Sequence, residues 1–254
     1  MSIFADYSKY YDLLYQDKDY NSEVGFIDGL LKQYAKQPKT LLELGSGTGK
    51  HACLLAKKDY HVVGIDQSRT MLEMAGHLLA QEPQAAKQIR LFEGDVRTFE
   101  IKEQFDAAIS LFHVLSYQTS NHDVEQMFET VKKHVKPSGI FIFDCWYGPA
   151  VLNQKPVVRY KRLENEILAV ERVAVPTIDE NANTVNVHYH LFVQEKPKLI
   201  FQKMEEDHLM RYYFLPELER ICAAFSMKIE LACEWLTQEP LSQDTWGACF
   251  VVRV

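Results

Sequence analysis

The sequence contains little that would crosslink the chain through disulfides or metal ions. It has five cysteines in 254 residues, an odd number, and no two of them have C-x-x-C spacing. A disulfide framework and a zinc ribbon are therefore not expected, and a chain of this length can bury enough apolar surface to fold without them. We expect the cysteines to be small buried hydrophobic residues, and we predict no metal site.

Long apolar runs and an excess of positive charge are also missing. No stretch approaches the roughly 20 apolar residues that cross a bilayer. No basic segment precedes an apolar run near Met1, so we expect no signal peptide and no membrane partner, and we place the protein in the cytoplasm. The formal net charge of −7 disfavours a nucleic-acid partner, because nucleic acids are bound largely by neutralising their phosphates.

The pattern of apolar residues divides the chain into three parts. Residues 1–37 are polar and rich in tyrosine, and we expect them to form a helical lid. Residues 38–148 and 214–254 alternate short apolar strands with helices, which predicts βαβ units and a mostly parallel sheet covered on both faces. Residues 149–213 alternate polar and apolar side chains and contain turn residues at 178–183, which predicts an antiparallel β insertion.

The expected elements follow from these periodicities. The predicted helices cover residues 24–34, 51–58, 70–80, 123–135 and 215–225. The predicted strands cover residues 40–44, 61–66, 89–92, 105–112, 140–144, 157–162, 167–175, 185–193, 199–213, 227–235 and 246–254.

A glycine-rich loop lies between the first predicted strand and its helix, with the sequence Glu43-Leu44-Gly45-Ser46-Gly47-Thr48-Gly49. Glycines at such a turn let the backbone approach a ligand closely, because no Cβ atoms intervene. Asp66 ends the next strand, where a carboxylate can accept hydrogen bonds from both hydroxyls of a ribose. Together the loop and Asp66 predict a nucleoside-bearing cofactor across the carboxyl ends of the strands.

Three kinds of cofactor compete for this loop. A P-loop requires G-x-x-x-x-G-K-[ST], but Gly49-Lys50 is followed by His51. A dinucleotide-binding loop requires a third glycine where this chain has Lys50, which disfavours NAD and FAD. S-adenosylmethionine has no pyrophosphate and suits a G-x-G-x-G turn preceded by an acidic residue. Glu93-Gly94-Asp95-Val96, after the third strand, adds a carboxylate and a backbone N–H that can bracket an adenine edge.

These motifs resemble those of the class I S-adenosylmethionine-dependent methyltransferases. ELGSGTG, the strand that ends in Asp66, and Gly94-Asp95-Val96 are similar to motifs I, II and III of that family. The resemblance implies a Rossmann-like α/β fold with a seven-stranded, mostly parallel sheet in the order 3-2-1-4-5-7-6, and the β insertion follows strand five. It also implies S-adenosylmethionine as cofactor, with S-adenosylhomocysteine as product. The predicted cofactor-binding residues are Tyr11, Tyr20, Glu43, Gly45, Gly47, Asp66, Gln67, Met71, Gly94, Asp95, Val96, Leu111 and Phe112.

A narrower resemblance covers almost the whole chain. The segments ADYS from residue 5, FHVLSY from residue 112 and EEDH from residue 205 are similar to the bacterial TDP-aminosugar N-methyltransferases. That family methylates the sugar amine of deoxysugar precursors and uses a β insertion to help bind the nucleotide sugar. The resemblance implies that Tyr7 and Tyr117 occupy catalysis-associated positions, with Tyr10 or Tyr11 as alternatives to Tyr7.

Methyl transfer from a sulfonium is an in-line displacement, so the protein mainly aligns the reactants and excludes water. An amine acceptor must be neutral at attack, and a nearby phenol or imidazole can take its proton or orient its lone pair. We therefore predict Tyr7, Tyr117 and His113 as catalytic residues. The predicted acceptor-binding residues are Trp146, Tyr147, Arg159, His188, His190 and Arg211. The spacing of His188 and His190 could also bind a metal ion, but no nearby carboxylate spacing supports that interpretation.

Several other functions stay open on the sequence alone. They are N- or O-methylation of another small molecule, methylation of a protein, a non-catalytic module that binds S-adenosylmethionine or a nucleotide, and an NAD-dependent dehydrogenase. Methylation of nucleic acid is disfavoured, because Leu111-Phe112-His113 contains no [DN]-P-P-[YF] segment to hold a flipped base. Strand edges of the insertion could pair between two copies of the chain, which leaves a homodimer open.

Overall fold

The structure is a computed structural model that describes residues 10, 13–196 and 200–254. Its core is a sheet whose parallel strands lie in the order β3 (Ile89–Glu93), β2 (His61–Asp66), β1 (Thr40–Leu44), β4 (Phe105–Ser110) and β5 (Val135–Tyr147). Two antiparallel strands continue it, β11 (Gly247–Arg253) beside β5 and then β10 (Lys228–Glu234). These seven strands have the predicted order 3-2-1-4-5-7-6, which confirms the predicted fold class.

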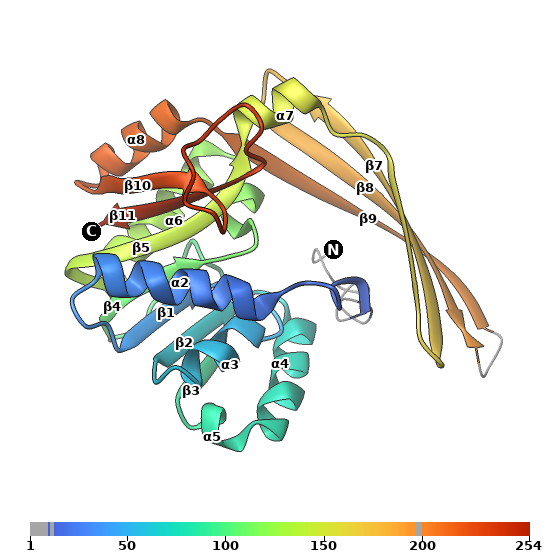
Figure 1. Cartoon of the computed structure of the whole chain (residues 1–254), viewed down its shortest axis with the longest axis horizontal. Helices are drawn as coiled ribbons and strands as arrows, with labels where there is room; N and C mark the ends of the chain where they lie inside the picture. Colours follow the sequence, from blue (N-terminus) through green and yellow to red (C-terminus); the bar gives the residue numbers. More distant parts are fainter. Residues whose placement is uncertain (1–9, 11–12, 197–199) are drawn as a thin grey trace.

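Helices cover both faces of this sheet (Figure 1). Leu41 and Leu42 are both fully buried on β1, but Leu41 packs into one hydrophobic cluster and Leu42 into the other. The first cluster contains buried residues of α2 (Tyr20–Tyr34), α3 (Lys50–Ala56) and α5 (Pro83–Ala86). The second contains buried residues of α6 (Asn121–His134) and α8 (Leu215–Ala224). Consecutive buried residues are typical of parallel strands that are covered on both faces.

Side-chain caps set where several helices begin. Ser68 caps α4 (Arg69–Gln81) by accepting a hydrogen bond from the Met71 N–H, and Ser120 caps α6 in the same way from Asp123. Asp19 accepts from the Ser22 N–H at the start of α2. That cap starts α2 four residues before the predicted position 24, because the apolar stripe alone does not show the polar first turn.

The β insertion consists of β6 (Arg159–Glu164), β7 (Leu168–Asp179), β8 (Thr184–Glu195) and β9 (Ile200–Tyr213), each antiparallel to the next. The end of β9 pairs in parallel with the end of β5, at Trp146–Tyr212 and Tyr147–Tyr213. Figure 1 shows the long strands leaving the core there and curving past the N-terminal part of the chain. Leu14 packs against Val170 and Leu191 of the insertion, and Tyr15 packs against Phe112 of the core, so residues 13–19 lie between the insertion and the core.

Among the elements that lie wholly within the described residues, three short ones were not predicted: α5, α7 (Gly148–Gln154) and the 3-10 helix η1 (Val114–Tyr117). α7 has a proline in its first turn, where the missing N–H is harmless. β5 also begins at Val135 rather than at the predicted residue 140. The five cysteines, all within the described residues, are buried, as predicted, and they form no disulfide. No helix in the described part of the chain is both long and apolar enough to cross a membrane.

Candidate active site

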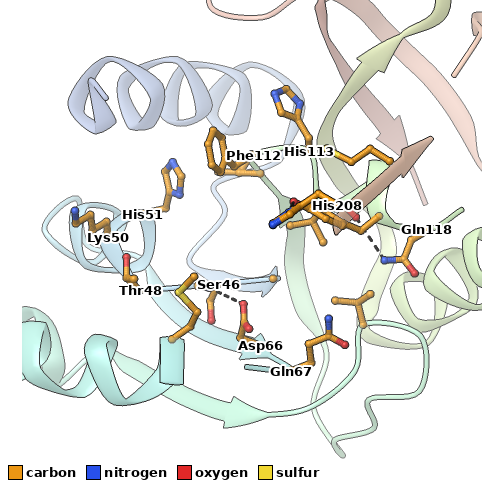
Figure 2. A pocket seen from close by; sticks show the side chains of 18 of the residues that line it. Ser46, Thr48, Lys50, His51, Asp66, Gln67, Phe112, His113, Gln118 and His208 are labelled. Carbon is orange, nitrogen blue, oxygen red and sulfur yellow. Dashed lines mark hydrogen bonds between the residues drawn. The ribbon is translucent and has the colours of Figure 1, made fainter. Parts of the chain in front are cut away.

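A cavity of about 360 Å³ opens where β1, β2 and β4 end. Figure 2 shows Asp66 and Gln67, at the end of β2, on one side of it and Phe112 and His113, after β4, on another. The lining includes eleven residues predicted to bind the cofactor: Tyr20, Gly45, Gly47, Asp66, Gln67, Met71, Gly94, Asp95, Val96, Leu111 and Phe112. Tyr11 lies outside the described residues, and Glu43 is not part of the described lining.

The glycine loop has a backbone that only glycine adopts easily. Gly45 and Gly47 have φ values of +78° and +53°, in the left-handed region. A Cβ added to Gly45 would lie 2.5 Å from a methyl group of Val114, whereas a Cβ added to Gly47 would meet no atom within 4 Å. Gly47 therefore faces open space in the cavity, where a ligand can approach its backbone.

Asp66 holds this loop in place from the end of β2. Its carboxylate oxygens accept hydrogen bonds from the backbone N–H groups of Gly47 and Ser68, both at 2.8 Å. Burial raises the pKa of Asp66, and the two backbone hydrogen bonds act in the opposite direction. Each carboxylate oxygen keeps a second lone pair, which can accept from a ligand hydroxyl.

Glu43 is buried beneath the glycine loop. Burial, together with the nearby charge of Asp66, raises the pKa of Glu43 to about 8, so the carboxyl group is protonated at neutral pH. Its Oε1 lies 3.8 Å from Nδ1 of His51, and Nε2 of His51 lies 2.7 Å from Glu23. Glu23 also pairs with Lys18, whose Nζ lies 2.9 Å from the same carboxylate. The sequence pattern did not indicate Lys18, Glu23 or His51, because they join the site only in the folded chain.

Arg97 holds the carboxylate of Asp95 at the adenine end of the predicted site. The guanidinium donates to both carboxylate oxygens, with Nη2 2.5 Å from Oδ2, and it also contacts Asp123 at 2.6 Å. The hydrogen bonds from Arg97 lower the pKa of Asp95, which keeps it ionised. Arg97 lines the cavity as well, although no sequence motif indicated it.

On the insertion side, Tyr117 of η1 meets His208 of β9. The Tyr117 hydroxyl lies 2.8 Å from Nδ1 of His208, and Nε2 of His208 lies 3.3 Å from a carboxylate oxygen of Glu206. Burial raises the pKa of Tyr117 well above that of an ordinary phenol, so the hydroxyl is neutral. Tyr117 and His208 both line the cavity. His208 was not predicted, although it closes the EEDH segment of the family resemblance.

His113 lies at the mouth of the cavity and is fixed by Asp144. Its backbone N–H donates to Asp144 at 3.1 Å, and its Nδ1 lies 2.7 Å from the same carboxylate. Asp144 is fully buried, which would raise its pKa, but His113 lowers the pKa overall. Phe112 and His113 have φ values of +66° and +63°, in the left-handed region that non-glycine residues adopt uncommonly.

The predicted acceptor-binding residues fall into two groups. Trp146 lines the cavity, whereas Tyr147 packs into the core and Arg211 pairs with Glu217 and Asn121. His188 and His190 lie on the face of β8 opposite Tyr189, the residue of β8 that reaches the cavity. Arg159 is exposed on β6 and outside the lining. Predicted Tyr7 lies outside the described residues.

Comparisons with known proteins agree on the class of protein. Residues 41–139 match a family model described as a methyltransferase domain. The chain is 27% identical over 233 residues to a dTDP-3-amino-3,6-dideoxy-alpha-D-glucopyranose N,N-dimethyltransferase of Streptomyces fradiae, covering 89% of this chain and 87% of the relative. It is 25% identical over 228 residues to a dTDP-3-amino-3,4,6-trideoxy-alpha-D-glucopyranose N,N-dimethyltransferase of Streptomyces venezuelae, covering 89% and 92%. A crystal structure of an S-adenosylmethionine-dependent methyltransferase from Clostridium acetobutylicum ATCC 824 has the same fold, with a TM-score of 0.83 at 20% identity over 97% of this chain and 96% of that one.

The cavity suits S-adenosylmethionine as the cofactor. The open space at Gly47 leaves room for a ligand against the loop backbone. Asp66 offers carboxylate oxygens that can accept hydrogen bonds from ribose hydroxyls, and Met71, Val96 and Leu111 add apolar lining. The family match, the order of the sheet and the cavity agree on an S-adenosylmethionine-dependent methyltransferase, and the chain resembles the class I enzymes and, among them, the TDP-aminosugar N,N-dimethyltransferases.

Proposed function

We propose that the protein transfers a methyl group to the amino group of a nucleotide-linked (TDP) amino deoxysugar. The observation that carries this proposal is the Tyr117–His208 pair, through which the insertion adds polar groups to a cavity built otherwise from the methyltransferase core. Both aminosugar-modifying relatives align with 89% of this chain, more than the methyltransferase core alone supplies. That coverage supports a shared role for the insertion.

The pair can orient an amine through a short series of hydrogen bonds. Glu206 accepts from Nε2–H of His208, which leaves Nδ1 as an acceptor. Tyr117 then donates its O–H to Nδ1, and the lone pairs of its oxygen remain to accept an N–H from the sugar amine. Because the Tyr117 phenol is neutral, we assign it a positioning role, with the amine lone pair directed away from it.

Bound S-adenosylmethionine supplies an activated methyl group. The chain's own residues exclude water from the site of transfer. Tyr15 packs edge-on against Phe112 with ring centroids 5.1 Å apart, and Lys18 places its ammonium 3.6 Å from the centre of the same ring. Tyr15 and Lys18 precede α2, so we assign residues 13–19, with Tyr20, to a lid over the cavity.

Arginines beside the cavity provide a place for the diphosphate. Arg172 of β7 lies 5.1 Å from the ring centre of Tyr189, which lines the cavity. Burial raises the pKa of Tyr189 to about 12, and the positive charges of Arg172 and Arg159 act in the opposite direction. Both guanidinium groups are therefore close enough to influence this part of the site, although neither arginine is among the residues that line the cavity. Trp146 offers an aromatic face for a base or sugar.

The test is to incubate the purified protein with S-adenosylmethionine and a panel of TDP-3-amino and TDP-4-amino deoxysugars. Mass spectrometry should show one or two added methylene masses on at least one member. If no member gains mass while S-adenosylhomocysteine binds to the same preparation, the aminosugar acceptor is wrong. An amine or hydroxyl of another small molecule, tested next, would then be the acceptor.

A further inference from the structure

The outer face of the insertion sheet has a second cluster of polar side chains, separate from the cavity. His188 and His190 alternate along β8 with Tyr189, and Glu205 and Asp207 alternate along β9 with His208. Tyr189 and His208 line the cavity. The two histidines and two carboxylates therefore lie on the opposite face of the sheet.

The register of β8 and β9 brings the carboxylates to the histidines. His188 is directly opposite Asp207, and His190 is directly opposite Glu205. This corrects the sequence-based view that no carboxylate supports a metal site there. The carboxylates come from the next strand, fifteen residues or more along the chain, so spacing within one segment does not show them.

The side chains converge with their ligand atoms close together. Nδ1 of His190 lies 3.1 Å from Glu205, and Nε2 of His188 lies 4.0 Å from the other oxygen of that carboxylate. The two imidazole rings have centroids 4.5 Å apart. Ligand atoms of His188, His190 and Glu205 all lie within 4.8 Å of one another.

We propose that His188, His190 and Glu205 bind a divalent transition-metal ion of the Zn²⁺ type. Two imidazole nitrogens and one carboxylate oxygen are a common protein ligand set for zinc, with water in the fourth position. Metal–ligand bonds of about 2.0–2.2 Å at tetrahedral angles separate ligand atoms by roughly 3.4 Å. Small rotations of these partly exposed side chains close the remaining difference.

Asp207 completes the site from behind His188. Its carboxylate lies 2.9 Å from Nδ1 of His188, which leaves Nε2 to face the ion. Asn186 donates to the same oxygen at 2.8 Å and fixes its position. A carboxylate on the far nitrogen of a ligating histidine orients the ring and raises its basicity.

Lys203 competes with the ion for Glu205. Its Nζ lies 2.5 Å from a Glu205 oxygen, and its side chain is exposed. Its long aliphatic chain lets the ammonium turn into solvent when a cation of higher charge arrives. A bound ion would crosslink β8 to β9 on the face opposite Tyr189 and His208. It would therefore stabilise the pairing of the two strands that carry these cavity residues.

The test uses the full-length, tag-free protein, stripped with a chelator and titrated with Zn²⁺ in a calorimeter. We expect one equivalent to bind with micromolar or tighter affinity, and Co²⁺ in its place to give the visible absorption of a tetrahedral site. His188→Asn and Glu205→Gln should each weaken binding more than tenfold. The matched control is His122→Asn, an exposed histidine on α6. Lys203→Met should tighten binding severalfold.

Binding of S-adenosylhomocysteine checks that each variant is folded. The absence of stoichiometric Zn²⁺ binding to the folded wild-type protein overturns the proposal. So does binding that survives both His188→Asn and Glu205→Gln, because the ion would then lie elsewhere. A Lys203→Met variant with unchanged or weaker affinity would contradict the competition for Glu205.

Discussion

At the scale of single residues, Tyr117 carries the most direct prediction about the acceptor. Tyr117→Phe keeps the ring and removes the oxygen that we propose accepts the amine N–H. We expect kcat/KM for the methyl acceptor to fall about tenfold to a hundredfold, while the Kd of S-adenosylhomocysteine stays unchanged. His208→Asn should have a similar effect, because it leaves the Tyr117 hydroxyl without its partner at 2.8 Å.

The double variant gives a sharper test of the same idea. If Tyr117 and His208 act in series, removing both should lower kcat/KM no more than the worse single change. Steady-state kinetics on the four proteins measure this coupling. If the two single losses of transition-state free energy add fully in the double variant, or if Tyr117→Phe keeps wild-type kcat/KM, then Tyr117 and His208 do not act through one another.

Glu43 predicts a pH dependence of stability in the ligand-free protein. Burial raises its pKa from 4.5 to about 8 in the folded state, so unfolding between these values releases a proton. The stabilising contribution is fully present below about pH 4.5 and is lost as the pH rises to about 8, at roughly 1.4 kcal/mol per pH unit. Glu43→Gln, which never ionises, should therefore gain stability relative to wild type as the pH rises.

Urea unfolding of both proteins at several values between about pH 5 and about pH 8 measures this difference. Other titrating groups are common to the two proteins and largely cancel. Asp59→Asn, an exposed change, is the matched control and should show no such trend. A difference between Glu43→Gln and wild type that stays flat across the range would mean that Glu43 is ionised in the folded protein.

Residues whose partners are distant in sequence are the ones that sequence reasoning did not find. Tyr117 was predicted from its motif, but His208 lies 91 positions away, and no local pattern joins the two. Arg211 was predicted to meet substrate because it is a cation in the insertion. In the structure it is buried against Asn121 and Glu217, and charge alone does not reveal that burial.

At the scale of elements, the glycine loop separates stability from ligand binding. Gly45→Ala adds a Cβ 2.5 Å from a methyl group of Val114 on a left-handed backbone. We expect it to lower the free energy of unfolding by about 2 kcal/mol or more, from strain and overpacking together. Gly47→Ala meets no atom within 4 Å, so it should cost only about 1 kcal/mol for its backbone conformation.

For ligand binding the ranking of the two variants should reverse, with Gly47→Ala losing more affinity than Gly45→Ala. The Cβ of Gly47→Ala extends into the cavity, so it should weaken S-adenosylhomocysteine binding more than tenfold even though the protein stays stable. Urea unfolding and calorimetric titration of the two variants provide both measurements. Equal losses of stability in the two variants, or wild-type affinity in Gly47→Ala, would count against the cavity geometry.

Elements with strong periodicity were predicted to within a few residues, whereas elements defined by local backbone geometry were not. The strand 61–66 and the helix 215–225 match β2 and α8 almost residue for residue, because burial sets their pattern. η1 begins after His113 in a left-handed conformation. It is too short to show a hydrophobic period, and it nevertheless carries Tyr117 into the cavity.

At the scale of the whole molecule, the alternation of strands and helices predicted the layers of the fold, and the family resemblance supplied the order of the strands. Neither the alternation nor the resemblance predicted the path of the insertion relative to the cavity. Alternation along β8 tells which residues share a face, but not that Tyr189 reaches the cavity while His188 and His190 face away from it. That difference depends on how the four strands curve from the end of β5, which is set by pairing at Trp146 and Tyr147.

This arrangement of two sheets around one cavity predicts how the protein distinguishes a nucleotide-linked sugar from a free one. Under the proposed function, the amine of either sugar would reach Tyr117, but only the nucleotide-linked sugar would bring a diphosphate to Arg172 on β7. Arg172→Gln removes a charge-assisted interaction worth about 1.5–3 kcal/mol. The KM for the TDP-aminosugar should therefore rise about tenfold to a hundredfold with kcat nearly unchanged, and kcat/KM for the free aminosugar should stay the same.

Arg220→Gln, on the exposed surface of α8, is the matched control and should leave KM and kcat/KM unchanged for both sugars. Raising the salt concentration should raise the wild-type KM for the TDP-aminosugar more than that of Arg172→Gln, because screening weakens a contact that the variant already lacks. Equal effects of Arg172→Gln on the free and the nucleotide-linked sugar would place the arginine's role in the fold of the insertion. The diphosphate would then have to be bound elsewhere.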